Sequence, residues 1–244
     1  GAKLGVILGS IGIIVEMFTV TGFGQRLSYA VVDIAGGHSF LLICLIAILT
    51  LFFGMGMPTP GAYLLAVLLS APALIKFGFP ELPVHMFVFY FAIISALTPP
   101  VAIGVLVAVG ISGGSYVGTA KEALRLAIPG FLLPFYFLYQ PEILGLAKNP
   151  LWALLYNFFL LMGTFGLTLF LDGFLLYRIG WVARILCLAG ALGIFHPSVV
   201  LSWVGFGILL IFGVIHYLFY SKMKQQETRS IGLGEPLKRN SAEA

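Results

Sequence analysis

The sequence predicts an all-α polytopic membrane protein, and three observations support this class. Hydrophobic residues make up 60% of the chain and charged residues only 9%, whereas a soluble domain has about 25% charged residues. Turn clusters divide the chain into apolar runs of helical length, which does not fit the short alternating strands of a membrane β-barrel. Two of these runs contain closely spaced prolines, at residues 58–60 and 99–100, and proline interrupts a helix.

The first apolar run, residues 4–22, is predicted to be one membrane span. Gly5, Gly9 and Gly12 give it a face of small residues with one Gly-xxx-Gly pair, which favours close helix packing. Glu16 either has a proton-linked function, as acids at membrane depth often have, or reaches the interface from a helix end. The chain opens without an initiator methionine, so we expect a fragment or a processed chain.

A helical hairpin is predicted over residues 38–77. His38 and Ser39 are expected to begin its first limb, the interruption covers residues 54–61, and the second limb ends at Lys76. Each limb is shorter than the roughly 20 residues that cross a bilayer. A re-entrant hairpin with its tip at mid-membrane therefore fits, as do two slightly short spans, and both return the chain to the same side.

The next run, residues 82–112, is too long for one straight span and is predicted to be a broken helix. Its interruption at residues 98–100 lies near the middle, which leaves two half-helices. The aromatic cluster at residues 87–91 is interpreted as packing or lipid-facing surface, and His85 as an interfacial residue rather than a ligand.

Four further spans are predicted from the remaining apolar runs, at residues 122–139, 151–171, 179–195 and 198–220. The first of them completes a domain of residues 1–145, and the other three form a C-terminal helical region of residues 146–220. Residues 221–244 are polar and charged, and we expect a disordered tail there.

Basic residues predict the orientation, because they are enriched on the cytoplasmic side of a membrane. Seven basic residues fall on one side: Lys3, Lys121, Arg125, Arg178, Arg184, Lys222 and Lys224. Arg26, Lys76 and Lys148 fall on the other side. The C-terminus is therefore predicted to be cytoplasmic. The net charge of +4 reflects this topology and gives no indication of a nucleic-acid partner.

The two interruptions supply the chemistry of a candidate cation site. Proline lacks an N–H group, so Pro58 and Pro60 leave the carbonyls of Gly54 and Gly56 without helical donors. In the same way Pro99 and Pro100 leave the carbonyls of Ser95 and Ala96 without helical donors. Unsatisfied carbonyls are tolerated at membrane depth only where protein buries them or a polar cavity receives them.

Hydroxyl oxygens stand beside these carbonyls, on Thr59, Thr98 and Ser95. Together they form a set of neutral oxygen ligands suited to a monovalent cation, and sodium (Na⁺) is the preferred hypothesis. A proton-coupled site would need a titratable group, for which Glu16 is the deep candidate. The four prolines are predicted to lie near substrate, because interrupted membrane helices mark transporter binding sites; they are Pro58, Pro60, Pro99 and Pro100.

Other chemistries lack their motifs, and the chain is predicted not to be an enzyme. The sequence contains no Gly-rich phosphate loop with a Lys-Ser/Thr pair, no His-Glu-x-x-His, and no Cys/His cluster with metal spacing. The only metal expected is therefore the monovalent cation, and no cofactor is expected. Cys44 and Cys187 lie in apolar segments and are interpreted as buried small hydrophobes. A structural membrane subunit remains the alternative, although it leaves the paired breaks without a purpose.

The two proline motifs resemble one known family. Gly-Met-Gly-Met-Pro-Thr at residues 54–59, followed by Leu-Thr-Pro-Pro-Val-Ala at residues 97–102, is similar to the second repeat of the large membrane subunit of TRAP (tripartite ATP-independent periplasmic) transporters. Residues 87–91, 108–114 and 122–125 look most like its fused-permease, TAXI-type branch. The resemblance covers residues 1–145 and is much weaker over the last three spans, which look like variable C-terminal helices of that branch.

The resemblance implies a permease of the elevator type in a bacterial or archaeal cytoplasmic membrane. Such a symporter imports an organic anion, classically a carboxylate, delivered by a periplasmic binding protein and driven by sodium or, in some members, by protons. Its two inverted repeats each contribute a hairpin and a broken helix, so this chain corresponds to one half. The other repeat, and a small membrane subunit or fused helices, would lie upstream. The chain departs from the family's Ser-Asp-Ile-Thr-Pro-Pro pattern at Ala96, where a carbonyl but no carboxylate is available.

Overall fold

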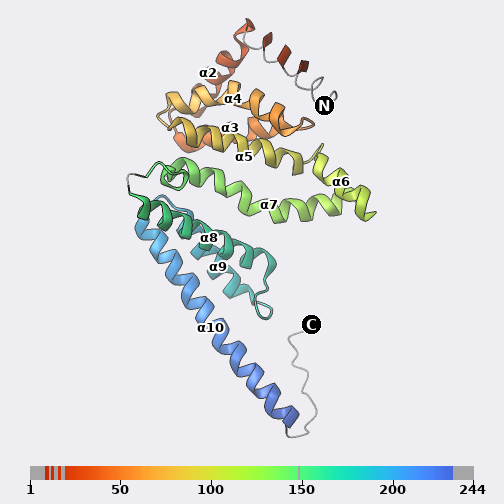
Figure 1. Ribbon diagram of the computed structural model, residues 1–244, viewed down its shortest axis with the longest axis vertical. Helices are drawn as coiled ribbons and strands as arrows, with labels where there is room; N and C mark the ends of the chain where they lie inside the picture. Colours follow the sequence, from red (N-terminus) through yellow and green to blue (C-terminus); the bar gives the residue numbers. More distant parts are fainter. Residues whose placement is uncertain (1–8, 11, 14–15, 18–19, 148, 233–244) are drawn as a thin grey trace. The chain divides into compact units, whose positions relative to one another are not determined.

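The computed structural model describes residues 9–232 apart from residues 11, 14–15, 18–19 and 148. The chain divides into two compact units, residues 1–153 and 154–244, with the boundary in the first turn of helix α8. Apart from one isolated bridge between Phe174 and Arg178, the regular structure of the described residues is helical (Figure 1). The predicted all-α class is therefore confirmed.

Three of the described helices are long and apolar enough to cross a membrane. They cover Thr59–Lys76, Pro150–Asp172 and Val199–Gln225. Shorter apolar helices accompany them at Ser39–Gly54, Glu81–Leu97, Ile103–Ser112 and Trp181–Phe195. A chain of this composition is an integral membrane protein, as predicted.

In the first unit, helix α2 (Phe23–Ala35) precedes the hairpin and was not predicted. Arg26 and Asp33 lie among its apolar residues, so its sequence does not predict a membrane span. The Ser28 hydroxyl donates a 2.6 Å hydrogen bond to the carbonyl of Leu69, and the Lys76 ammonium lies 4.8 Å from the centre of the Tyr29 ring. Both contacts attach α2 to the second limb of the hairpin.

Helices α3 (Ser39–Gly54), α4 (Thr59–Lys76) and α5 (Glu81–Ile94) lie side by side in this unit (Figure 1). Gly36 and Gly37 form the turn before α3, both with positive φ, at 56° and 84°. Helix α3 begins where the first limb was predicted to begin, with His38 as the N-cap residue, although the His38 side chain makes no capping hydrogen bond.

The core of the first unit is built from α3, α4 and α5 together with the C-terminal part of α7. Ile43, Leu74 and Phe87 are fully buried in it. The ring of Phe87 lies 4.9 Å from that of Phe91 and 5.6 Å from that of Phe135. The packing interpretation of the aromatic cluster is therefore confirmed for its buried members.

The predicted broken helix is interrupted where the prolines place the break. Helix α5 ends at Ile94, and a short 3-10 helix η1 (Ser95–Leu97) follows it. Residues 98–102 are not helical, and α6 (Ile103–Ser112) begins after them. Helix α7 (Tyr116–Tyr139) starts earlier than the predicted span because the Ser115 hydroxyl accepts a 3.2 Å hydrogen bond from the Gly118 N–H and caps it. A second 3-10 helix, η2 (Pro141–Leu144), follows α7.

The second unit contains α8 (Pro150–Asp172) apart from its first turn, α9 (Trp181–Phe195) and α10 (Val199–Gly232). Arg184 of α9 caps the C-terminus of α8, because its guanidinium donates to the carbonyls of Phe170 at 2.8 Å and Leu171 at 2.7 Å. These carbonyls lie in the last turn of α8, where intrahelical donors are missing, and a cation there is favoured by the helix dipole.

Helices α9 and α10 cross closely at glycines. A Cβ on Gly205 would lie 2.8 Å from the backbone nitrogen of Ile194 and in contact with the carbonyl of Gly190. A Cβ on Gly193 would lie 3.3 Å from the Cα of Gly205. Small residues thus bring the two backbones together, as in other membrane helix pairs.

The predicted tail and the predicted first span lie partly outside the described residues, and the prediction for the tail needs correction. The predicted disordered tail from Ser221 is wrong as far as Gly232, which α10 reaches, because Lys, Met and Gln are good helix formers and extend the helix. Residues 233–244 lie outside the described residues. In the first span Gly5 also lies outside them, and a Cβ on Gly9 or Gly12 would meet nothing within 4 Å in the described chain.

Candidate functional site at the two helix breaks

The hairpin tip is a tight turn of four residues. Its N–H groups at Met55 and Met57 donate to the carbonyls of Phe52 at 3.3 Å and Gly54 at 3.4 Å. Gly56 has a φ of 80°, which glycine adopts without strain. The break is narrower than the predicted residues 54–61, because α4 begins at Thr59 and accommodates Pro60 in its first turn, where a missing N–H costs little.

The second break runs from Thr98 to Ala102. Thr98 is extended, and Ala102 is left-handed at φ 41° and ψ 64° while only 1% exposed. A left-handed conformation costs about 1–2 kcal/mol for a residue with a Cβ, and such strain is found where the surrounding structure holds a functional geometry. Gly104, in the first turn of α6, lies close to η1, since a Cβ there would be 3.2 Å from the Ala96 carbonyl oxygen.

The two breaks meet. A Cβ on Gly54, the last residue of α3, would lie 2.6 Å from the Ser95 Cβ and in contact with its hydroxyl oxygen. A Cβ on Gly56 would lie 3.7 Å from a methyl group of Val101. The hairpin tip therefore packs along the interruption of the broken helix, and only glycine fits at the closest point.

Turn hydrogen bonds satisfy two of the carbonyls that the prolines were predicted to leave without donors. The carbonyl of Gly54 accepts from the Met57 N–H, and that of Ser95 accepts from the Thr98 N–H at 3.2 Å. Turn N–H groups thus replace the helical donors that Pro58 and Pro99 cannot supply to these two carbonyls. A carbonyl oxygen has two lone pairs, so each can still accept a further ligand.

Two of the three predicted hydroxyl ligands donate to the helical segment in which they lie. The Ser95 hydroxyl donates to the carbonyl of Ala92 at 2.7 Å, and the Thr98 hydroxyl donates to the carbonyl of Ile94 at 3.0 Å. Thr59 is partly exposed at the first position of α4. A hydroxyl that donates a hydrogen bond still has oxygen lone pairs with which it can bind a cation. The arrangement suits a cation ligand and also suits simple capping of the local backbone.

Thr50 is a further candidate hydroxyl ligand that the sequence did not single out. Its side chain is only 1% exposed, and its hydroxyl oxygen has no hydrogen-bond partner among the described residues. Thr50 lies one helical turn before Gly54, so both residues share the face of α3 that meets Ser95. The signal in the sequence is a hydroxyl four residues before the break, and a buried hydroxyl without a partner costs about 1–3 kcal/mol.

Tyr116 is a second residue that the sequence did not single out. Its hydroxyl donates a 2.7 Å hydrogen bond to the carbonyl of Pro100. The first residue of α7 thus attaches to the interruption of the broken helix and satisfies a carbonyl that the interruption frees.

The remaining polar candidates lie elsewhere or form no metal site. Glu16 is helical and exposed. His85 lies two to three turns before the end of α5 at Ile94, where its Nδ1 pairs with the Tyr63 hydroxyl at 2.8 Å. Within the described part of the chain there is no group of three or more His, Cys, Asp or Glu side chains that could hold a metal ion.

A comparison with known protein families gives the same family as the resemblance of the two proline motifs. The family model of the DctM component of tripartite ATP-independent periplasmic transporters matches residues 1–153. No curated protein and no solved structure matches the chain. The matched region contains the hairpin, the broken helix and α7, and it covers more than half of the chain. The chain therefore belongs to the DctM family, the TRAP transporter large membrane component.

Proposed function

We propose that the chain is the permease component of an importer driven by an ion gradient, which takes an organic anion such as a carboxylate from a periplasmic binding protein. The observation that carries this proposal is the contact between the two breaks, at Gly54 and Ser95. The membrane is the bacterial or archaeal cytoplasmic membrane, with the C-terminus on the cytoplasmic side.

Sodium is the coupling ion in this proposal. Helix α3 ends at Gly54, and the segment formed by α5 and η1 ends at Leu97, so two helix C-termini with partial negative charge meet at the breaks. The proposed ligands are neutral oxygens of residues at or next to the breaks: the carbonyls of Gly54, Gly56 and Ala96, and the hydroxyls of Thr50, Thr59, Ser95 and Thr98. This donor set fits a monovalent cation better than a proton, for which Glu16 is the alternative.

The anion is proposed to bind close to the same breaks. Helices α4 and α6 begin there, and the N–H groups of a first helical turn attract negative charge. Pro58, Pro60, Pro99 and Pro100 would line this substrate region. Cation and anion would then stabilise each other, which provides the physical basis of symport.

The chain is proposed to work with a second, inverted repeat and with a small membrane subunit or fused helices, in the manner of the TAXI-type branch. A carrier of inverted repeats holds its ligands between the repeats. One hairpin and one broken helix supply half of such a site.

Replacing Thr59 or Thr98 by valine is expected to raise the sodium concentration that gives half-maximal uptake about tenfold, equivalent to about 1.4 kcal/mol. Thr50→Val should act in the same direction. The reason is the loss of one oxygen ligand at nearly constant side-chain volume. The measurement is substrate uptake against sodium concentration by the complete transporter.

Thr164→Val is the matched control, because the Thr164 hydroxyl also donates to its own helix, to the carbonyl of Leu160 at 3.0 Å. It should leave the sodium dependence unchanged. Unchanged half-saturation in all three break variants would remove these hydroxyls from the site. Uptake that responds to a proton gradient and not to sodium would point to Glu16.

The proposed orientation is tested by labelling two single cysteines. Lys148→Cys and Lys224→Cys, each in a background lacking Cys44 and Cys187, should be labelled from opposite sides of the membrane, because the basic residues around Lys224 are expected to stay cytoplasmic. An impermeant thiol reagent added to intact cells should label only position 148. Labelling of both positions from outside would overturn the orientation.

A further inference from the structure

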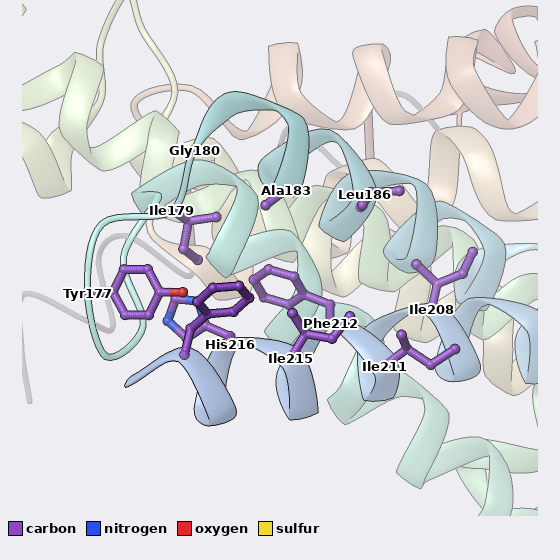
Figure 2. A pocket seen from close by; sticks show the side chains of 11 residues that line it. Tyr177, Ile179, Gly180, Ala183, Leu186, Ile208, Ile211, Phe212, Ile215 and His216 are labelled. Carbon is purple, nitrogen blue, oxygen red and sulfur yellow. The ribbon is translucent and has the colours of Figure 1, made fainter. Parts of the chain in front are cut away.

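The second unit contains an apolar pocket that the proposed transport cycle does not use. Its volume is about 430 Å³, in the range of about 300–1,000 Å³ typical of small-molecule sites. Helices α9 and α10 and the loop before α9 line it (Figure 2).

One face of α10 supplies most of the apolar lining. Ile208, Ile211, Ile215 and Phe219 follow one another at helical spacing and line the pocket. Ala183 and Leu186 of α9 line the facing side. Ile211, Ile215 and Phe219 remain 49–60% exposed, so the pocket is an open groove along α10 and its ligand can enter from the side.

The end of the pocket near the loop is closed by a fixed polar pair. Tyr177 stacks on His216 with ring centres 3.8 Å apart and planes at 9° (Figure 2). The Leu176 N–H donates to His216 Nε2 at 3.4 Å, and the loop closes on itself through the Ile179 N–H, which donates to the Gly173 carbonyl at 2.8 Å. His216 is 3% exposed, so it attaches the loop to α10 and shapes the pocket.

Two exposed cations lie at this same end. Arg178 stands between the pocket residues Tyr177 and Ile179 and is exposed. Lys222, also exposed, is three residues beyond Phe219, a rise of about 4.5 Å along α10. It is seven residues, or two turns, beyond Ile215 and therefore lies on the same face. Along this face of α10 the surface changes from apolar to cationic.

We propose that this pocket binds an anionic glycerophospholipid, with one acyl chain along the isoleucine face and the phosphate at Arg178 and Lys222. A chain of methylenes matches the apolar groove, and basic residues at the end of a membrane helix attract anionic headgroups. The order of apolar and cationic residues along α10 matches the order of chain and headgroup in a lipid. A transmembrane helix of another subunit would match the groove but not its cationic end.

The test is lipid binding to the purified full chain, measured by native mass spectrometry. Phosphatidylglycerol and phosphatidylcholine with the same acyl chains are the probes. We expect phosphatidylglycerol to bind more tightly, and Arg178→Gln combined with Lys222→Gln to weaken its binding about tenfold or more while leaving phosphatidylcholine binding unchanged. Lys121→Gln combined with Lys224→Gln removes the same net charge elsewhere and should have no effect.

Ile215→Trp, which fills the groove, should weaken the binding of both lipids. Equal binding of the two lipids, or equal effects of the two charge-removing pairs, would overturn the headgroup assignment. Should the variants not fold, phosphatidylglycerol with a photoreactive acyl chain is applied to the unmodified chain. Labelling within residues 208–219 supports the proposal, and labelling confined to other segments contradicts it, as would cross-linking of this face to a helix of another subunit.

Discussion

Gly54→Ala is expected to destabilise the first unit by about 1–3 kcal/mol, the usual cost of overpacking, and to abolish transport. The added methyl group would contact the Ser95 side chain, which its hydrogen bond to the Ala92 carbonyl holds in place. The hairpin tip would have to move away from the interruption of the broken helix. Thermal unfolding in detergent and substrate uptake measure the two effects separately.

Gly110→Ala is the matched control, because Gly110 lies in α6 and a Cβ there meets nothing within 4 Å. It should be neutral or slightly stabilising, since alanine favours a helix over glycine by about 1 kcal/mol. Adding Ser95→Gly to Gly54→Ala removes the obstructing side chain and should restore stability. A Gly54→Ala protein with unchanged stability and uptake would refute the contact between the breaks.

Gly205→Ala is expected to destabilise the second unit by about 3 kcal/mol or more. The atoms that the new methyl group would meet belong to the backbone of α9, at Gly190 and Ile194, and backbone cannot rotate out of the way. The crossing of α9 and α10 would have to open along its length. Thermal unfolding of the purified chain is the measurement.

Gly213→Ala is the control for this second change. Gly213 lies in the same helix, and a Cβ there meets nothing within 4 Å. Its thermal stability should match or slightly exceed that of the unmodified chain, because alanine favours a helix over glycine. Equal stability of the two alanine variants would contradict the close crossing of α9 and α10.

Local chemistry accounts for what could be predicted from the sequence. The paired prolines remove backbone donors within apolar runs, so the two interruptions were predicted within a few residues. The single prolines Pro72, Pro129 and Pro134 lie inside α4 and α7 and do not end these helices. Composition and run length were sufficient for the all-α membrane class. The extent of the hairpin break was overestimated because Pro60 fits the first turn of α4.

Contacts between distant segments account for most of what was missed. Nothing near Gly54 in the sequence indicates that it faces Ser95, and the buried Thr50 gains its meaning only from that contact. The turn hydrogen bonds at Gly54 and Ser95 depend on the geometry of each turn rather than on residue type. Helix α2 was missed because its apolar face is one side of an amphipathic helix, docked on α4 through Ser28.

Equilibrium binding of radiolabelled sodium to the purified complete transporter tests the central proposal most directly. We expect saturable binding that unlabelled sodium displaces and potassium does not. Binding should weaken about tenfold in Thr98→Val and stay unchanged in Thr164→Val, because only the first hydroxyl lies at the meeting breaks. Absence of saturable sodium binding, or binding that Thr98→Val and Thr164→Val leave equally intact, would contradict a sodium site at the two helix breaks.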